Sequence, residues 1–217
     1  MITPRKFQRF STLLVMTTLL FTGFGVEAQE VKLPAPDKKG GSSLMETLWQ
    51  RKSEREFSNK ELSQKDLSNL LWAACGVNRP NDGKRTNPTA RNLQEVTLYV
   101  FFADRVCRYD HKTHSLTQVA KGDHRALLAS GQEFVLQAPV TLLMVANMES
   151  FGEKGDIRQW MGAVDAGIVS ENINLFCAAY GFATVPRFMM DRDALTKLLG
   201  LSDKQVAILN NPVGYRK

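Results

Sequence analysis

The residues best suited to hold a charged ligand lie in the stretch R-K-S-E-R-E-F, residues 51–57. Arg51, Ser53 and Arg55 alternate, so an extended chain would present them on one face and turn Lys52 away. An arginine guanidinium is a planar fork of donors that suits phosphate oxygens, and a serine hydroxyl adds a small donor. We interpret the stretch as a candidate site for the phosphate end of a cofactor. Taken alone, it also fits a solvated charge run at a helix end, with Phe57 in the core.

A second candidate is the basic, amide-rich loop at residues 83–94, directly before an apolar strand pattern. It contains Pro88, Thr89, Asn92 and Gln94. Asparagine and glutamine amides can read the donor–acceptor edge of a planar heterocycle. An ordinary loop with solvated charges is the alternative.

A third candidate is the segment T-V-P-R-F-M-M-D, residues 184–191. Here Pro186, Arg187, Phe188 and Met189 lie between a strand pattern and a helix start. Such a segment could lie against a flat ring system with its backbone N–H groups turned inward. A plain strand-to-helix connection explains the same residues.

Other catalytic arrangements find less support. Cys107, Asp110, His111 and His114 are metal-ligand types, but they lie around a predicted hairpin tip where side chains diverge, so a turn is the favoured interpretation. No G-x-S-x-G elbow is present, and the glycines near residue 152 do not form a dinucleotide-binding G-x-G-x-x-G loop.

Composition indicates one globular domain. The chain has 217 residues, is 43% hydrophobic and carries a formal charge of +6. The basic excess is scattered, which argues against nucleic acid as a partner. The odd number of cysteines, Cys75, Cys107 and Cys177, excludes a complete intramolecular disulfide framework, and their apolar contexts predict burial.

The N-terminus has the pattern of a secretory signal peptide. Basic residues at 5–9 precede an apolar run at 13–21, and V-E-A at 26–28 offers a cleavage site after Ala28. The run is short for a membrane span, so we expect none in the mature chain. We therefore expect residues 1–28 to be a signal peptide, 29–42 a flexible linker and 43–217 the domain of an exported, periplasmic protein.

The hydrophobic pattern alternates between helical and strand periods, which predicts an α+β fold. The expected helices cover residues 43–49, 63–76, 123–130, 156–180 and 191–199. The expected strands cover residues 95–103, 106–109, 115–119, 139–146, 182–185 and 206–209. Small residues in the 156–180 helix would allow another helix to approach closely.

Together these features resemble the nitroreductase-like FMN flavoproteins, and especially their subgroup related to thiazole/oxazole-forming dehydrogenases. The resemblance covers nearly all of residues 43–217. It rests on five motifs in order: R-x-S-x-R-x-F at 51–57, R-T-N-P-T-A at 85–90 with Asn92 and Gln94, D-A-G at 165–167, V-P-R at 185–187 and P-V-G-Y at 212–215.

The resemblance implies a mixed central sheet flanked by helices, with the long helix at the interface of an obligate homodimer that holds two FMN molecules. It implies that Arg51, Ser53 and Arg55 contact the phosphate, ribityl chain or ring edge of FMN, and that Arg216 completes the phosphate site. It also assigns the cofactor-binding loop to Pro88, Thr89 and Asn92, with Asn92 hydrogen-bonded to the isoalloxazine. The remaining ring contacts near N5 fall to Pro186, Arg187, Phe188 and Met189.

The implied activity is two-electron transfer from a reductant such as NAD(P)H, through flavin N5, to a nitro, quinone or similar small acceptor. No side-chain acid or base is then required. A non-catalytic flavin-binding protein and a dehydrogenase of peptide-derived azoline rings are the alternatives. Phe188 stands where many relatives have glycine, and it would either narrow the substrate pocket or fold outward. Glu95 stands where nitroreductases often have proline.

Overall fold

The computed structural model describes residues 30–152 and 156–217. The signal-peptide prediction for residues 1–28 falls outside these ranges. In the described chain, seven strands form one sheet in the order β1-β6-β5-β4-β7-β9-β8, with every ladder antiparallel. The predicted α+β class with a central sheet flanked by helices is confirmed. The described strands pair only in antiparallel fashion, whereas a mixed sheet was expected.

The elements of the sheet and its covering layers have the following bounds. The sheet strands are β1 (Glu30–Lys32), β4 (Val96–Phe101), β5 (Arg105–Asp110), β6 (Ser115–Lys121), β7 (Val140–Asn147), β8 (Phe182–Thr184) and β9 (Gln205–Tyr215). The helices are α1 (Leu44–Gln50), α2 (Gln64–Cys75), α3 (Arg125–Ala129), α4 (Phe134–Gln137), α5 (Ile157–Tyr180) and α6 (Arg192–Leu199). Smaller elements are β2 (Val77–Arg79) and β3 (Lys84–Arg85), which form a separate hairpin, and the 3₁₀ turns η1 (Ala90–Asn92) and η2 (Met148–Phe151).

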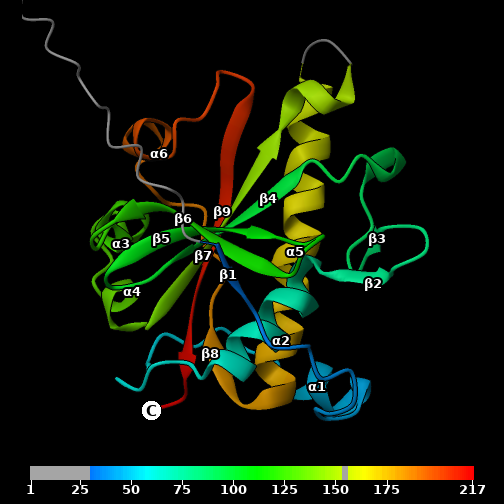
Figure 1. Ribbon diagram of the computed structural model, residues 1–217. Coiled ribbons are helices and arrows are strands. Elements are labelled where there is room, and N and C mark those ends of the chain that lie inside the picture. The colour runs from blue at the N-terminus through cyan, green and yellow to red at the C-terminus, as the bar shows by residue number, and fades with distance from the viewer. Residues whose placement is uncertain (1–29, 153–155) are drawn as a thin grey trace, which may run out of the picture.

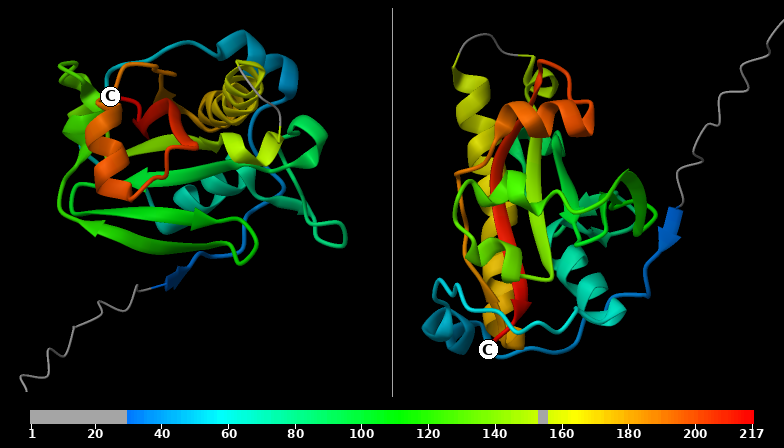
Figure 2. Two further views of the ribbon diagram at one scale, coloured as in Figure 1. Left: turned by 90° about the horizontal axis from the view of Figure 1, so that it is seen from above. Right: turned by 90° about the vertical axis from the view of Figure 1, so that its left-hand side faces the viewer.

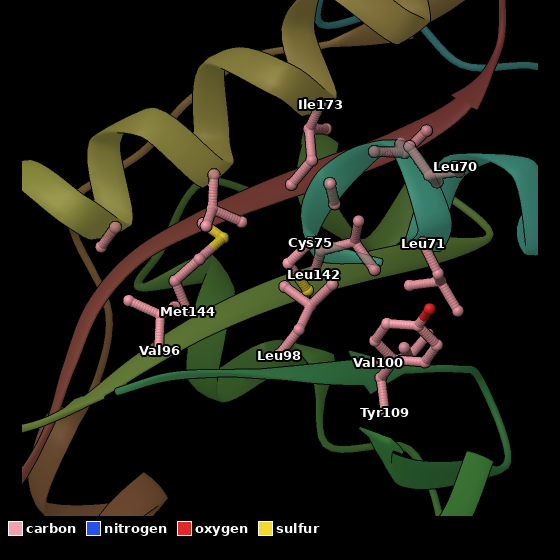
Figure 3. Close-up of a cluster of buried hydrophobic side chains, with 14 of the residues drawn as sticks. Leu70, Leu71, Cys75, Val96, Leu98, Val100, Tyr109, Leu142, Met144 and Ile173 are labelled. Carbon is pink, nitrogen blue, oxygen red and sulfur yellow. The ribbon is translucent and has the colours of Figure 1, made fainter. Parts of the chain in front are cut away.

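The central strands are apolar on both faces because helices cover both faces. On β4, Leu98 and Val100 belong to a core cluster with α2 and α5, whereas Tyr99 and Phe101 pack in a second cluster with α3 and α6. This alternation follows from the two-residue period of a strand. Figure 1 shows α2 and α5 on one side of the sheet and α3, α4 and α6 on the other. Figure 3 shows the first cluster, where Ile173 of α5 and Leu70 of α2 point toward the sheet.

Local sequence signals set the ends of several helices. Ser43 and Ser63 cap α1 and α2, and Asp191 caps α6; each side chain accepts a hydrogen bond from a first-turn backbone N–H. Gly181 and Gly200 end α5 and α6 in the left-handed conformation that glycine tolerates. These boundaries agree with the sequence-based prediction.

The segment expected to be a flexible linker is instead held against the domain. Strand β1 pairs with β6, and the Leu33 N–H donates to His114 O at 3.0 Å. The Ser68 hydroxyl donates to Pro34 O at 2.6 Å, and the Asp37 N–H donates to Asn69 Oδ1 at 2.7 Å. The linker prediction was wrong here because local composition does not report hydrogen bonds to residues far along the chain.

The last strand is longer than predicted. It was expected at residues 206–209, but β9 runs to Tyr215 and includes Pro212. Pro212 pairs with Thr141 of β7, while the ladder to β8 begins only at Val213. Proline lacks a backbone donor, so it is tolerated where one flank of the strand has no ladder partner. Among the helices of the described chain, none combines the length and hydropathy needed to traverse a lipid bilayer.

Candidate functional site

The segment after α1 is extended and fixed by backbone hydrogen bonds. The Glu54 N–H donates to Thr184 O of β8, and the Ser58 N–H donates to Tyr215 O of β9, each at 2.9 Å. Between them, Phe57 is buried and forms an isolated bridge with Arg216. Ser53 and Arg55 remain exposed and Arg51 is half-buried. The helix therefore ends before Arg51, and the chain continues in an extended form with these side chains at the surface and Phe57 in the core, an arrangement that both interpretations of the stretch share.

Arg216 lies beside this segment, as the sequence led us to expect. Its Nη2 atom is 3.0 Å from Glu54 Oε1, and its buried Nε atom has no hydrogen-bond partner in the described chain. Glu54 was not singled out from the sequence, although it lies within the motif. An acidic residue between two arginines was the available signal. The unpartnered Nε atom leaves Arg216 a donor for a ligand.

The Arg187 side chain points inward, whereas its neighbours in the expected ring-lining segment are exposed. Its side chain is buried, and its Nη1 atom donates to Leu128 O at 2.5 Å and Asn210 Oδ1 at 2.8 Å. Its Nη2 and Nε atoms donate to Ala129 O and Gln132 Oε1. These bonds commit the guanidinium to protein acceptors. We therefore revise its role from contacting a ring to positioning the 184–189 segment.

Two buried amides that the sequence reasoning missed hold the same segment. On β9, Asn210 Nδ2 donates to Met189 O at 3.2 Å. The next residue points to the other face, where Asn211 Nδ2 donates to Asn174 Oδ1 and Thr184 Oγ1 and Asn211 Oδ1 accepts from Ser170. Adjacent asparagines in a strand that is otherwise apolar were the signal. Buried amides are retained when their hydrogen bonds are satisfied.

Pro186, Phe188 and Met189 are exposed, so this part of the segment can face a ligand. Phe188 is 61% exposed, and the Arg192 guanidinium lies 4.2 Å from its ring centroid. Of the two conformations considered, Phe188 therefore folds outward. It borders a largely apolar hollow of about 290 Å³ with Trp160 on α5.

The loop that carries Pro88, Thr89 and Asn92 is attached to α5 and not to the arginine segment. The Ala90 N–H donates to Asp165 Oδ2 at 2.9 Å, and the Gln94 N–H donates to Thr89 Oγ1 at 3.0 Å. Asn92 and Pro88 are exposed. Positive φ angles at Arg91, Asn92 and Gln94 force a sharp path that non-glycine residues rarely adopt.

Directly after this loop, two buried carboxyl groups lie together. Glu95 is 5% exposed, and neither of its side-chain oxygens has a hydrogen-bond partner in the described chain. Burial raises the pKa of Glu95 to about 7, and the adjacent Asp165 carboxyl adds to the rise while the loop backbone and Arg85 oppose it. A proton held at Glu95 allows the two carboxyl groups to share this space.

The expected site residues therefore form two groups in one chain. The first contains Arg51, Ser53, Arg55 and Arg216. Phe188 lies apart from this group, at the hollow that it shares with Trp160 and Ile208. The second contains Pro88, Thr89 and Asn92. Asp165 of α5 holds the second group through Ala90. From Asp165, α5 continues for 15 residues to Tyr180, which is a rise of about 22 Å at 1.5 Å per residue. Strand β8 follows and contacts the first group. Figure 1 shows β3, which leads into the second group, higher along α5 than β8 and the C-terminus, and Figure 2 (right) shows α1 and the C-terminus at the same end of the molecule.

The histidines of the β5–β6 hairpin have protein partners. His114 lies 2.7 Å from both Ser68 Oγ and Tyr109 OH, and His111 lies 3.0 Å from Arg85 Nη2. In residues 30–152 and 156–217, no group of three His, Cys, Asp or Glu side chains is arranged to hold a metal ion. Cys75, Cys107 and Cys177 are buried and free, as predicted from their contexts.

Residues 48–215 match the Nitroreductase family. A Methanocaldococcus jannaschii protein with a provisional nitroreductase name is 28% identical over 203 residues, which cover 88% of this chain and 98% of the relative. A crystal structure of a provisionally named nitroreductase from Ralstonia eutropha is 36% identical, has a TM-score of 0.82 and is matched over 89% of this chain and 92% of that one. A structure from Anabaena variabilis, 18% identical with a TM-score of 0.72, covers 88% of this chain and 42% of that one and shows a likeness of fold alone. The chain therefore belongs to the Nitroreductase family, a membership that implies an oxidoreductase.

Proposed function

We propose that the protein is an FMN-dependent oxidoreductase that acts as a homodimer. The observation that carries the proposal is the extended segment at 51–57, which presents Arg51, Ser53 and Arg55 beside Arg216. Backbone hydrogen bonds to β8 and β9 hold the segment in place without using these side chains. A preorganised set of cations and a hydroxyl suits a phosphate monoester.

The donor chemistry of this group fits FMN at its phosphate end. Within the described ranges, neither Arg51 nor Arg55 is in an ion pair, and the buried Nε of Arg216 lacks an acceptor. Arg55 lies over the Phe134 ring at 6.0 Å, and Arg187 lies over it at 5.6 Å. Phe134 thus orients Arg55 while leaving its N–H groups available.

The separation of the two residue groups supports a site built from two chains. FMN is too compact for its ring to lie at Asn92 and its phosphate at Arg55 of the same chain if both groups stay where they are. A partner related by twofold symmetry would supply the second group. Exposed apolar residues on adjoining helices support this dimer: Trp49 on α1 is 89% exposed and Trp160 on α5 is 72% exposed.

When bound, FMN would supply two-electron transfer through N5 between a reductant such as NAD(P)H and a nitro, quinone or similar acceptor. The chain's residues would bind and orient it. Arg51, Ser53, Arg55 and Arg216 would hold the phosphate side, and the Asn92 amide would hydrogen-bond the ring edge, next to Pro88 and Thr89. Pro186 and Met189 would form an apolar border that limits water near the ring, whereas Phe188 points outward.

We also propose that the protein is exported through the signal sequence at residues 1–28 and acts in the periplasm. Export would separate it from the cytoplasmic NAD(P)H pool, so the assay must also identify the physiological reductant.

The test is to purify the protein from the cell envelope and measure bound flavin and turnover. We expect a yellow protein with one FMN per subunit that is reduced by NAD(P)H or dithionite and reoxidised by a nitroaromatic or a quinone. Reduction without reoxidation by any acceptor would favour a flavin-binding protein. A colourless protein with no affinity for FMN would overturn the proposal.

A further inference from the structure

Strands β4 and β5 part from each other before either strand ends. Their ladder stops at Tyr99 opposite Arg108, yet β4 continues to pair with β7 down to Val96 and β5 continues to pair with β6 up to Asp110. A pocket of about 260 Å³ occupies this fork. Figure 3 shows Cys75, Val96, Leu98 and Tyr109 between α2 and the sheet, where they line its inner wall.

The guanidinium of Arg85 is inserted into the fork. The residue is 5% exposed, Nη1 donates to Val96 O at 3.0 Å, and Nη2 lies 3.0 Å from the His111 ring. Guanidinium has five N–H donors, and the buried Nε has no hydrogen-bond partner among residues 30–152 and 156–217. No carboxylate of the described chain lies within ion-pair distance of Arg85. A buried cation without a counter-charge is costly, so a ligand that supplied one would be favoured.

The charges around the pocket add to this preference. Arg108 and Lys112 line its exposed rim. The one carboxylate in the lining, Asp110, already accepts from the backbone N–H groups of Lys112 at 2.7 Å and Thr113 at 3.3 Å. Glu95 acts on Arg85 from outside the lining, at longer range.

The neutral groups of the pocket would not repel an anion. Burial raises the pKa of the Cys75 thiol to about 11, so at neutral pH it is uncharged. Burial and the nearby Arg85 cation lower the pKa of His111 to about 4, so its ring is neutral and can orient the guanidinium without adding charge.

We propose that the fork between β4 and β5 is a binding site for one small oxyanion, of the phosphate or carboxylate class. The anion would accept hydrogen bonds from the free Arg85 N–H groups, and Arg108 and Lys112 would close over it from the rim. The volume admits such an anion with a short substituent but not a nucleotide. The site uses none of the residues assigned to FMN, so it stands apart from the proposed oxidoreductase function.

The test is a titration of the full protein, with and without saturating FMN, in which phosphate or acetate replaces chloride at constant ionic strength. Amide NMR signals of Thr97, His111 and Lys112 report on the fork. We expect saturable shifts with one anion per chain. The anion that saturates the shifts at the lower concentration, phosphate or acetate, identifies the class of oxyanion that the site prefers.

Rim substitutions keep the test independent of the buried arginine, whose removal could unfold the chain. Arg108→Gln with Lys112→Gln should weaken anion binding at least about tenfold, because it removes two charge-assisted contacts. The matched control, Lys121→Gln with Lys197→Gln, removes the same charge from exposed positions outside the pocket and should change affinity less than about twofold. Shifts that never saturate, or an equal loss in both pairs, would overturn the proposal. Loss of the shifts in Arg51→Ala with Arg55→Ala would instead assign the anion to those residues and would also overturn it.

Discussion

The backbone N–H of Ala90 donates a 2.9 Å hydrogen bond to Oδ2 of the buried Asp165, and this bond ties the Asn92 loop to the long helix α5. The loop has three non-glycine residues at positive φ, which an isolated loop would relax. The position of Asn92 therefore depends on an anchor on another element.

Removing this anchor should destabilise the protein in a way that depends on the acceptor atom. We expect Asp165→Ala to lower the free energy of unfolding by about 1–3 kcal/mol more than Asp165→Asn, because asparagine keeps an oxygen for the Ala90 N–H. Both variants remove the charge next to Glu95, so their difference isolates the hydrogen bond. Urea unfolding followed by circular dichroism measures it. Equal losses in the two variants would show that the bond contributes nothing.

The pKa of Glu95 predicts how stability changes with pH. The folded protein holds the Glu95 proton up to about pH 7, whereas an ordinary Glu releases it near 4.5. The native state thus binds more protons than the unfolded chain in this window, so the Glu95 contribution is fully present below about 4.5 and is lost as pH rises through about 7. The change is on the order of 3 kcal/mol.

Glu95→Gln should remove this pH dependence, because a glutamine amide stays neutral and can donate to Asp165. We expect the variant to match the parent protein near pH 5 and to exceed its stability at pH 8. Chemical denaturation across that range tests the expectation, with the exposed Glu61→Gln as the matched control. Parallel pH profiles for Glu95→Gln and the parent would contradict it.

Substitutions in the 51–57 segment test the proposed phosphate contacts. Arg51→Ala and Arg55→Ala should each weaken FMN binding by about 1.5–3 kcal/mol, since each would remove a charge-assisted hydrogen bond. Lys52→Ala is the control, because this exposed side chain alternates with the other two and should leave affinity nearly unchanged. Flavin fluorescence titration gives the dissociation constants. Equal effects of all three substitutions would indicate general charge attraction instead of a site.

The exposed tryptophans test the proposed dimer. We expect Trp49→Glu with Trp160→Glu to shift the protein to a monomer and to reduce bound FMN, because each site would lose the residues of its partner. Light scattering after gel filtration measures the mass. Val119→Glu, at an exposed apolar position on β6, should leave the dimer intact. A parent protein that is monomeric with full FMN occupancy would contradict the two-chain site.

Several features of the protein could be predicted because their causes are local. Ser43, Ser63 and Asp191 cap helices through their own first turns, and the period of two at residues 96–101 identifies a strand buried on both faces. In each case, the physical cause lies within a few residues of the signal.

Other features depend on residues distant in sequence, and only the tertiary structure decided them. Arg187 turns inward because Leu128 O, Ala129 O and Asn210 converge on its guanidinium, although its local sequence suits a ligand contact. Strand β1 forms because β6 offers it an edge, and β9 passes through Pro212 because β7 continues beside it. The separation of Asn92 from Arg55 follows from the length of α5. The order of the motifs in the sequence does not show how far apart they lie in the folded chain. Sequence thus determined most of the elements and the chemistry available, whereas packing determined which side chains are buried and which reach the surface.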